Sequence, residues 1–145
     1  MSIQCLDMTI DHYDEVVALW NSCEGLGEAE PHDEIDRFLR RNAGFSLIAR
    51  DGKTLVAAAL CGHDGKRGYL YHVAVSPTHR RQGIGEQIVR VCLDRLGAIG
   101  IVRCSIHLYI DNDDGEQFWL STGWRRRTDL KVMAQDLKVE GRNTQ

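Results

Sequence analysis

The sequence lacks three features that would each point to a different class of protein. No C-x-x-C pair occurs among its five cysteines, whose odd number argues against a disulfide framework and against a cysteine-based zinc site. The longest apolar run, Leu55 to Cys61, is far shorter than the ~20 residues that a membrane-spanning helix needs. Lys and Arg total 18 against 21 Asp and Glu, and this net charge of −3 argues against a general nucleic-acid binder.

Proline is scarce, at 2 residues, and no low-complexity stretch or internal repeat occurs. The apolar share of 43% and charged share of 27% are ordinary for a globular protein and argue against wholesale disorder. A length of 145 residues predicts one domain, residues 1–145. Acidic residues within the first 20 positions argue against a signal peptide. We therefore expect a cytoplasmic protein with reduced thiols, of which Cys61, Cys92 and Cys104 are small core residues.

Hydrophobic periodicity and turn residues predict short strands that alternate with helices. Tyr13, Val16 and Trp20 recur at helical spacing. Asp51-Gly52 marks a tight hairpin between two β runs. We expect helices to begin near residues 13, 31, 83 and 116, and strands to cover 2–8, 45–50, 54–61, 69–75, 102–110, 124–127 and 130–137. Early hairpins followed by strand–helix–strand passages predict an α/β chain with one mixed sheet and helices packed on it.

One segment between a predicted strand and a predicted helix has the composition of an anion site. It reads Arg80-Arg81-Gln82-Gly83-Ile84-Gly85. The first N–H groups of a helix have no internal partner, and they carry part of the positive end of the helix dipole. Glycine lets a phosphate approach the backbone, and the two arginines can add charge-assisted hydrogen bonds. The segment lacks the G-K-[ST] of a P-loop and the third glycine of a dinucleotide fingerprint, so by itself it also fits an ordinary loop-to-helix junction.

The flanks of this segment carry a resemblance to a known family. Val73-Ala74-Val75 ends the preceding strand, and Asn112 and the stretch Phe118–Trp124 follow later. This order resembles the GNAT (Gcn5-related N-acetyltransferase) superfamily, in its compact bacterial type similar to ribosomal-protein N-terminal acetyltransferases. The resemblance covers roughly residues 2–137. It implies a mixed, mostly antiparallel sheet of six to seven strands, flanked by about four helices and splayed between strands 69–75 and 102–110.

The resemblance also implies a binding mode for acetyl-CoA, without a metal. Backbone N–H groups of residues 82–85 would hold the coenzyme pyrophosphate. The strand end would pair with the pantetheine arm and direct one N–H at the thioester carbonyl, where it would stabilise the developing oxyanion. Asn112 and Trp119 would flank the coenzyme near its sulfur. The expected coenzyme-binding residues are Ala74, Val75, Arg80, Arg81, Gln82, Gly83, Ile84, Gly85, Asn112 and Trp119.

The reaction that the resemblance implies is transfer of an acetyl group to a primary amine by direct attack, without an acyl-enzyme. The acceptor stays open between a small molecule, a protein N-terminus and a lysine. Trp119 stands where many members carry a Tyr that protonates the leaving thiolate, and an indole N–H is no practical acid. Either the thiolate leaves without an enzymic acid, or Tyr109 or Tyr71 supplies the proton.

Two histidines compete for the role of general base. His107 stands where ribosomal-protein acetyltransferases carry a Glu, and it is either a base or a half-exposed strand histidine. His72 faces either the cleft or a covering helix. Because side chains alternate along a strand, we expect Tyr71 to lie on the opposite face from His72 and to line the cleft. The catalytic candidates are therefore His107, Tyr71 and His72.

Two clusters of charged residues each have two possible interpretations. Glu24, Glu28 and Glu30 lie between the first two helices, where they either attract a cationic amine or simply face solvent. The arginines at 125–127 are interpreted as an edge strand whose charge prevents further sheet pairing, with binding of an acidic partner as the alternative.

An amine acetyltransferase is the favoured function among three. The alternatives are an acyl-CoA-binding sensor or regulatory module with little catalysis, and a phosphate- or nucleic-acid-binding module. We expect an amine acceptor as partner and neither nucleic acid nor a membrane. A homodimer follows only by analogy with small acetyltransferases that pair through their last strands.

Overall fold

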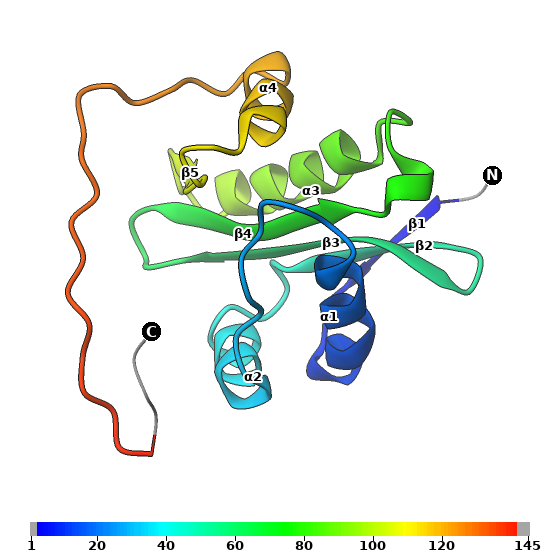
Figure 1. The fold of residues 1–145 in the computed structure, drawn as a ribbon, viewed down its shortest axis with the longest axis horizontal. Coiled ribbons are helices and arrows are strands. Elements are labelled where there is room, and N and C mark those ends of the chain that lie inside the picture. Colours follow the sequence, from blue (N-terminus) through cyan, green and yellow to red (C-terminus); the bar gives the residue numbers. More distant parts are fainter. Residues whose placement is uncertain (1–2, 142–145) are drawn as a thin grey trace.

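The computed structural model describes residues 3–141, in which one five-stranded sheet lies between two layers of helices (Figure 1). The strands follow one another across the sheet as β1 (Ile3–Asp7), β2 (Leu47–Asp51), β3 (Thr54–His63), β4 (Gly68–Val75) and β5 (Cys104–Ile106). The first four are antiparallel, whereas β5 runs parallel to β4. Parallel neighbours need a crossover, and α3 (Ile84–Ala98) provides it.

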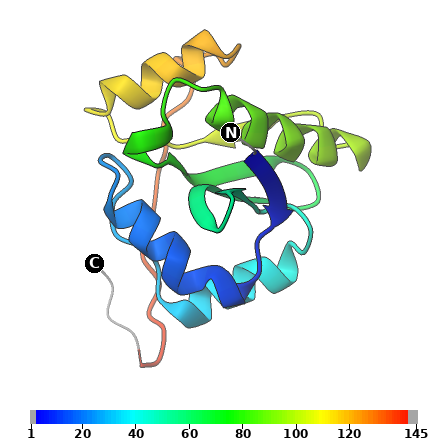
Figure 2. The ribbon, with the colours of Figure 1, turned by 90° about the vertical axis from the view of Figure 1, so that its right-hand side faces the viewer.

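Helices cover both faces of the sheet. α1 (Tyr13–Asn21) and α2 (His32–Arg41) lie on one side, while α3 and α4 (Asp113–Ser121) lie on the other (Figure 2). The short 3-10 turn η1 (Ile10–His12) leads into α1, and a second one, η2 (Pro77–His79), follows β4. The predicted helices and the Asp51-Gly52 hairpin are confirmed, and Gly52 has the left-handed φ of 61° that such a turn requires.

The central strand β3 is buried on both of its faces. Ala57, Ala59 and Cys61 pack in the core beside α3, whereas Ala58 and Leu60 pack in the core beside α1 and α2. A strand with no face in water has no reason to alternate with polar residues, which explains the uninterrupted apolar run.

Three thiols predicted as small core residues pack as expected. Cys61 and Cys92 are fully buried, and Cys104 packs partly buried against the same core. Burial raises the pKa of the Cys104 thiol to about 12, so this side chain stays protonated and behaves as an apolar packing group.

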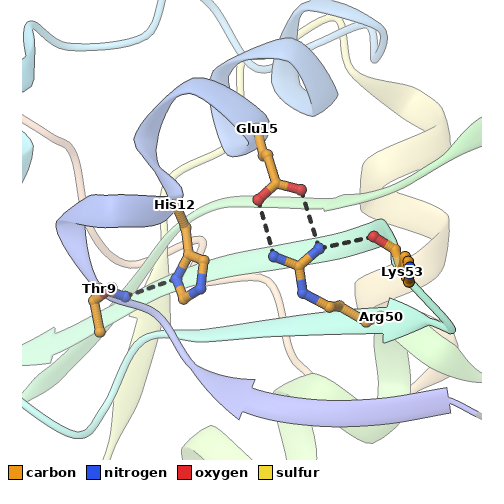
Figure 3. A network of polar contacts seen from close by, with 5 residues as sticks. All are labelled: Thr9, His12, Glu15, Arg50 and Lys53. Atoms are coloured by element: carbon orange, nitrogen blue, oxygen red, sulfur yellow. Dashed lines mark hydrogen bonds and ion pairs between the residues drawn. The ribbon is translucent and has the colours of Figure 1, made fainter.

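An ion pair fastens α1 to the sheet. Arg50 on β2 donates hydrogen bonds of 3.0 and 2.9 Å to the carboxylate of Glu15 on α1, and one of 3.1 Å to the Lys53 carbonyl (Figure 3). The hydrogen bonds from Arg50 lower the pKa of Glu15. Because the Glu15 side chain is 48% exposed, the pair contributes on the order of 1 kcal/mol or less.

β4 and β5 part after a short contact. Three residue pairs join them, from Gly68 with Cys104 to Leu70 with Ile106. Beyond Leu70, β4 continues to pair with β3 while the chain after β5 turns away. The predicted splay is confirmed, although the second strand spans three residues instead of the expected 102–110.

A bulge interrupts β4 beside this splay. Ala58 pairs with Ala74 but Leu60 pairs with Tyr71, so His72 and Val73 both stand opposite Ala59. His72 takes a left-handed φ of 49°. The Tyr71 ring lies edge-on to Phe38 of α2, and the His72 ring lies against Trp20 of α1, so both side chains are on the α1 and α2 face of the sheet. Because a bulge re-aims side chains in this way, the expectation that they lie on opposite faces is wrong.

The last two predicted strands do not form, so the sheet has five strands and not six to seven. Residues 124–138 run along the outside of the molecule without joining the sheet (orange to red in Figure 1). A strand is stabilised by hydrogen bonds to a neighbour, which local sequence cannot supply. The edge-strand interpretation of 125–127 is therefore wrong. Arg126 instead donates hydrogen bonds of 3.0 and 2.9 Å to Glu116, and Arg127 binds Asp129.

Candidate active site

A cleft with a volume of about 1770 Å³ opens where β4 and β5 separate. Its walls are β4, the first turn of α3, the chain after β5, α4 and the loop after α1. Of the predicted site residues, all except Gln82 line it: Tyr71, His72, Ala74, Val75, Arg80, Arg81, Gly83, Ile84, Gly85, His107, Asn112 and Trp119. The described side chains of His, Cys, Asp and Glu contain no group of three that could hold a metal ion. Within residues 3–141, no helix combines the length and apolar character that crossing a bilayer requires.

One end of the cleft is the N-terminus of α3. Gly83 caps the helix with a φ of 80°, and a Cβ built on it would meet no atom within 4 Å. Gln87 is the first residue whose N–H donates into the helix, to the Gly83 carbonyl at 3.0 Å. The preceding N–H groups, those of residues 84–86, therefore point out of the helix end by its geometry. Open space over a helix N-terminus fits a phosphate group.

Close packing holds this end of the cleft in place. A Cβ on Gly85 would lie 3.2 Å from Val75 Cγ2 and 3.3 Å from Phe118 Cζ, so the helix start needs glycine to approach β4 and α4. Arg80 donates from Nε to the Val75 carbonyl at 3.2 Å. Arg80 thus ties the loop to the end of β4, whereas Arg81 is exposed, with a left-handed φ of 62°.

The wall opposite β4 is built by α4. The Asn112 side chain caps the helix by accepting a hydrogen bond of 3.0 Å from the Gly115 N–H. Trp119 is 6% exposed, and its ring lies edge-on against Phe118 and Trp124, with centroids 5.0 and 4.7 Å apart. Trp119 is therefore an aromatic wall residue.

The loop between α1 and α2 spans the cleft from one wall to the other. A Cβ on Gly25 would lie 2.7 Å from Asn112 Nδ2, and one on Gly27 would lie 2.6 Å from Tyr109 Oη. Both glycines have left-handed φ values, 82° and 74°. The loop thus contacts the far side of the splay, and only glycine permits that approach.

The other end of the cleft holds His72 and Tyr71. His72 Nε2 lies 2.5 and 3.1 Å from the two carboxylate oxygens of Glu30. The ring of Trp20 lies against the imidazole, with centroids 4.8 Å apart and planes at 37°. Glu30 is thus bound to a histidine, while Glu24 and Glu28 are exposed. Burial, together with the nearby Tyr69 and Glu30, raises the pKa of Tyr71.

His107 lines the cleft from the opposite side, after β5. Its side chain is exposed, and its ring lies edge-on to Tyr69 with centroids 6.5 Å apart. The structure therefore places the three catalytic candidates around one cleft, with His107 separated from the other two by the splay.

Two residues near His72 were not predicted from the sequence to belong to the site. Cys23 lines the cleft and lies with Sγ 3.6 Å from the Val75 carbonyl, while Trp20 contacts His72 from α1. Cys23 follows the first helix in sequence and lies beside β4 only through packing of the loop. The helical spacing of Trp20 indicated a buried face but not the histidine that it meets.

Known proteins resemble the chain in sequence and in fold. The Acetyltransferase (GNAT) family matches residues 13–124. A protein named acetyltransferase from Yersinia pestis (strain Pestoides F) is 31% identical over 104 residues, which are 71% of this chain and 74% of that protein.

Two solved structures have the same fold at low sequence identity. The ribosomal-protein-alanine N-acetyltransferase of Brucella melitensis biovar Abortus 2308 superposes with a TM-score of 0.72 at 17% identity, over 93% of this chain and 100% of that one. AAC(6')-Iy in complex with the bisubstrate analogue CoA-S-monomethyl-acetylneamine superposes with a TM-score of 0.74 at 14% identity, over 94% and 100%. From the sequence matches and this shared fold, the chain belongs to the GNAT family and is an acyltransferase.

Proposed function

We propose that the protein transfers the acetyl group of acetyl-CoA to a primary amine by direct attack of that amine. The observation that carries the proposal is the cleft itself, which joins an open helix N-terminus at Gly83 to proton-exchanging side chains at His72 and Tyr71. One chain thus offers an anion site and a proton acceptor along one continuous surface. The family is one that uses acetyl-CoA, and its AAC(6')-Iy structure contains a coenzyme-derived bisubstrate analogue.

The chain offers specific groups to a bound coenzyme. The N–H groups of residues 84–86 suit the pyrophosphate, and the guanidinium of Arg81 is free to add a charge-assisted hydrogen bond. From Tyr71 to Ala74, the edge of β4 that faces β5 pairs with no strand of residues 3–141, so its backbone is available to an extended pantetheine arm. The Val75 carbonyl at the end of this edge already accepts a hydrogen bond from Arg80. A β4 N–H directed at the thioester carbonyl would stabilise negative charge on its oxygen.

The leaving thiolate would meet different residues here, because Trp119 stands where many members of the family carry a proton-donating Tyr. When bound, the coenzyme supplies an acetyl thioester whose sulfur departs as a thiolate. Tyr71 carries its proton at neutral pH, since burial raises its pKa, and it can therefore donate a hydrogen bond in the cleft. Trp119 bounds the site without exchanging a proton.

Five acidic residues line the cleft, namely Glu24, Glu86, Asp111, Asp113 and Asp114. Glu86 lies at the start of α3, whereas the other four lie on the loop after α1 and at the start of α4, and we take these four to form the rim of the acceptor side. Such a rim attracts a cationic amine and raises its local concentration. We therefore infer an acceptor with more than one positive charge, such as a polyamine, an aminoglycoside or a basic peptide.

Acetyl-CoA consumption across a panel of amines tests the proposal. The panel holds polyamines, aminoglycosides and peptides with a free N-terminus or a lysine. We expect turnover with at least one member and none with a neutral amide control. Tight coenzyme binding without turnover on any acceptor would favour the regulatory-module alternative, and absence of coenzyme binding would overturn the proposal.

We further infer that two copies of the chain associate through residues 128–139. Five large apolar side chains of this segment are exposed: Leu130 58%, Val132 71%, Met133 87%, Leu137 74% and Val139 56%. The sequence has strand character there, and β5 carries an unpaired outer edge in the described structure. One chain thus holds both a free strand edge and an extended apolar segment, which a second copy can pair reciprocally.

Sedimentation of the wild type tests this inference against two double variants. Leu130→Asp/Met133→Asp is expected to convert a dimer into a monomer of 16.4 kDa. Thr128→Asp/Gln135→Asp adds the same two negative charges at polar positions of the segment and is expected to retain the dimer. A wild type that stays monomeric at all concentrations would contradict the inference.

A further inference from the structure

The contact between His72 and Glu30 joins segments 42 residues apart and is partly shielded from water. Both carboxylate oxygens of Glu30 reach Nε2, at 2.5 and 3.1 Å, and the two side chains are 13% and 28% exposed. Trp20, at 2% exposed, packs against the imidazole ring. The imidazole is thus held from three elements: β4, α1 and the loop between α1 and α2.

The backbone of His72 is held in a conformation that histidine seldom adopts. A left-handed φ costs a residue with a Cβ on the order of 1 kcal/mol, and the value here is 49°. Glycine or asparagine would fit this position at a lower cost. A strained residue in a cleft points to a role for its side chain, and the bulge that carries it aims the imidazole at Glu30 and into the cleft.

The contact with Glu30 selects which nitrogen is available for chemistry. A carboxylate accepts hydrogen bonds and does not donate them, so neutral imidazole keeps its proton on Nε2 beside Glu30. The lone pair of Nδ1 is then free to accept a proton. We propose that His72 is the general base for the acceptor amine and that Glu30 is its positioning residue. This proposal rests on the acetyl transfer proposed above.

The step is balanced without any further reactant. The acceptor nitrogen forms a bond to the acetyl carbon while the carbon–sulfur bond breaks, and the sulfur leaves with the bonding electron pair. The amine proton passes to Nδ1 of His72, and the imidazolium formed is stabilised by the Glu30 carboxylate. The imidazolium then releases its proton to water, and the thiolate takes one up from Tyr71 or from water.

The surroundings of His72 favour it over His107 for this role. Cys23, Glu24 and Tyr71 are the other titratable groups on its side of the cleft, and His107 and Tyr109 face it from beyond the splay. Two histidines of this cleft meet a carboxylate in the described part of the chain, His72 with Glu30 and His79 with Asp51. Both ring nitrogens of His79 have partners, with Nε2 2.9 Å from Asp51 and Nδ1 2.8 Å from Thr78 Oγ1, whereas His72 meets Glu30 through Nε2 alone. The exposed ring of His107 contacts Tyr69. An orienting carboxylate fixes the tautomer and the direction of a catalytic imidazole.

Replacing His72 with glycine tests the base directly, because glycine suits the left-handed backbone. We expect His72→Gly to keep the melting temperature and the affinity for acetyl-CoA while kcat falls about 100-fold or more. Added imidazole should restore part of kcat in this variant and leave the wild type unchanged. The pH profile of kcat/KM should differ from that of the wild type once the imidazole side chain is absent. His72→Asn, which also tolerates the backbone, should lose the same activity.

Glu30→Gln tests the positioning role. Its amide can donate to Nε2 and so favour the wrong tautomer, and we expect kcat to fall on the order of 100-fold with little change in KM for acetyl-CoA. Glu28→Gln removes the same charge from an exposed position in the same loop and should behave as wild type. Glu30→Asp, which keeps the carboxylate, should recover part of the loss.

The outcomes separate this inference from the proposed function. A wild type that neither binds acetyl-CoA nor turns it over contradicts the proposed function itself. An active wild type with a fully active His72→Gly variant overturns the His72–Glu30 pair alone. A His72→Gly variant that loses activity together with its melting temperature and coenzyme binding, without rescue by imidazole, would make the pair structural and would also overturn the inference.

Discussion

The two ends of the cleft are built in different ways. The proposed coenzyme end comes from consecutive residues, Arg80 to Gly85, where a loop and a helix start leave N–H groups without helical partners by local geometry. The proposed acceptor end comes from Trp20, Glu30 and His72, which lie on separate elements and meet only in the folded chain. In the proposed mechanism, binding depends on a motif visible in the sequence, whereas proton transfer depends on a tertiary contact. Substitutions at each end should therefore have separable effects on coenzyme affinity and on kcat.

The largest effect is expected from Gly83→Glu. A side chain at φ 80° strains the backbone, and its carboxylate would occupy the open space over the helix N-terminus. Titration calorimetry should show affinity for acetyl-CoA reduced by at least ~100-fold. Gly97→Glu places the same residue in α3 where a Cβ also meets no atom and φ is not left-handed, so it should bind like wild type. Equal binding by both variants would contradict a coenzyme site at Gly83.

Replacing His72 and His107 in two separate variants should show which wall of the cleft supplies the general base. We expect kcat to fall about 100-fold in His72→Gln and about threefold or less in His107→Gln, because of these two histidines it is His72 that meets an orienting carboxylate within residues 3–141. Both variants should keep the affinity of wild type for acetyl-CoA. A larger loss in His107→Gln would move the base to the far wall.

Protection of a thiol reports whether a ligand fills the middle of the cleft. Cys23 lies beside the Val75 carbonyl, so bound acetyl-CoA should slow its alkylation roughly tenfold. Cys104, with a pKa raised to about 12, has little thiolate at pH 8 and should stay unmodified. Peptide mapping after brief iodoacetamide treatment, with Cys23→Ser as control, measures both. Alkylation of Cys23 at one rate with and without coenzyme would argue against a pantetheine arm along β4.

The smallest effect is expected far from the cleft, at Glu15. Glu15→Gln removes one partner of Arg50 and should lower stability by about 1 kcal/mol or less, a shift of a few degrees in melting temperature. Hydrogen bonding lowers the pKa of Glu15, so the contribution is complete above its ordinary pKa and is lost as pH falls through the lowered value. Thermal melts at pH 7 and pH 3 should therefore differ less in the variant. Activity should be unchanged.

Features that depend on nearby residues were predictable. The hairpin at Asp51-Gly52, the cap at Asn112 and the start of α3 after Gly83 each follow from turn, capping and helix-end chemistry within a few residues. The short β5 and the missing strands at 124–137 were not, because β character in a sequence does not reveal whether a partner strand stands beside it.

The sequence by itself determined the helices, the central hairpin and the family, and it located the segment proposed to bind the coenzyme, because each depends on spacing along the chain. The tertiary structure decided which acidic residue meets His72, and it did so through a bulge in β4 and a glycine-rich loop that spans the cleft. A bulge reverses the alternation of side chains from which Tyr71 and His72 were assigned to opposite faces. Contacts between residues 42 apart arise from packing of the whole chain, and they cannot be predicted from the spacing of neighbouring residues.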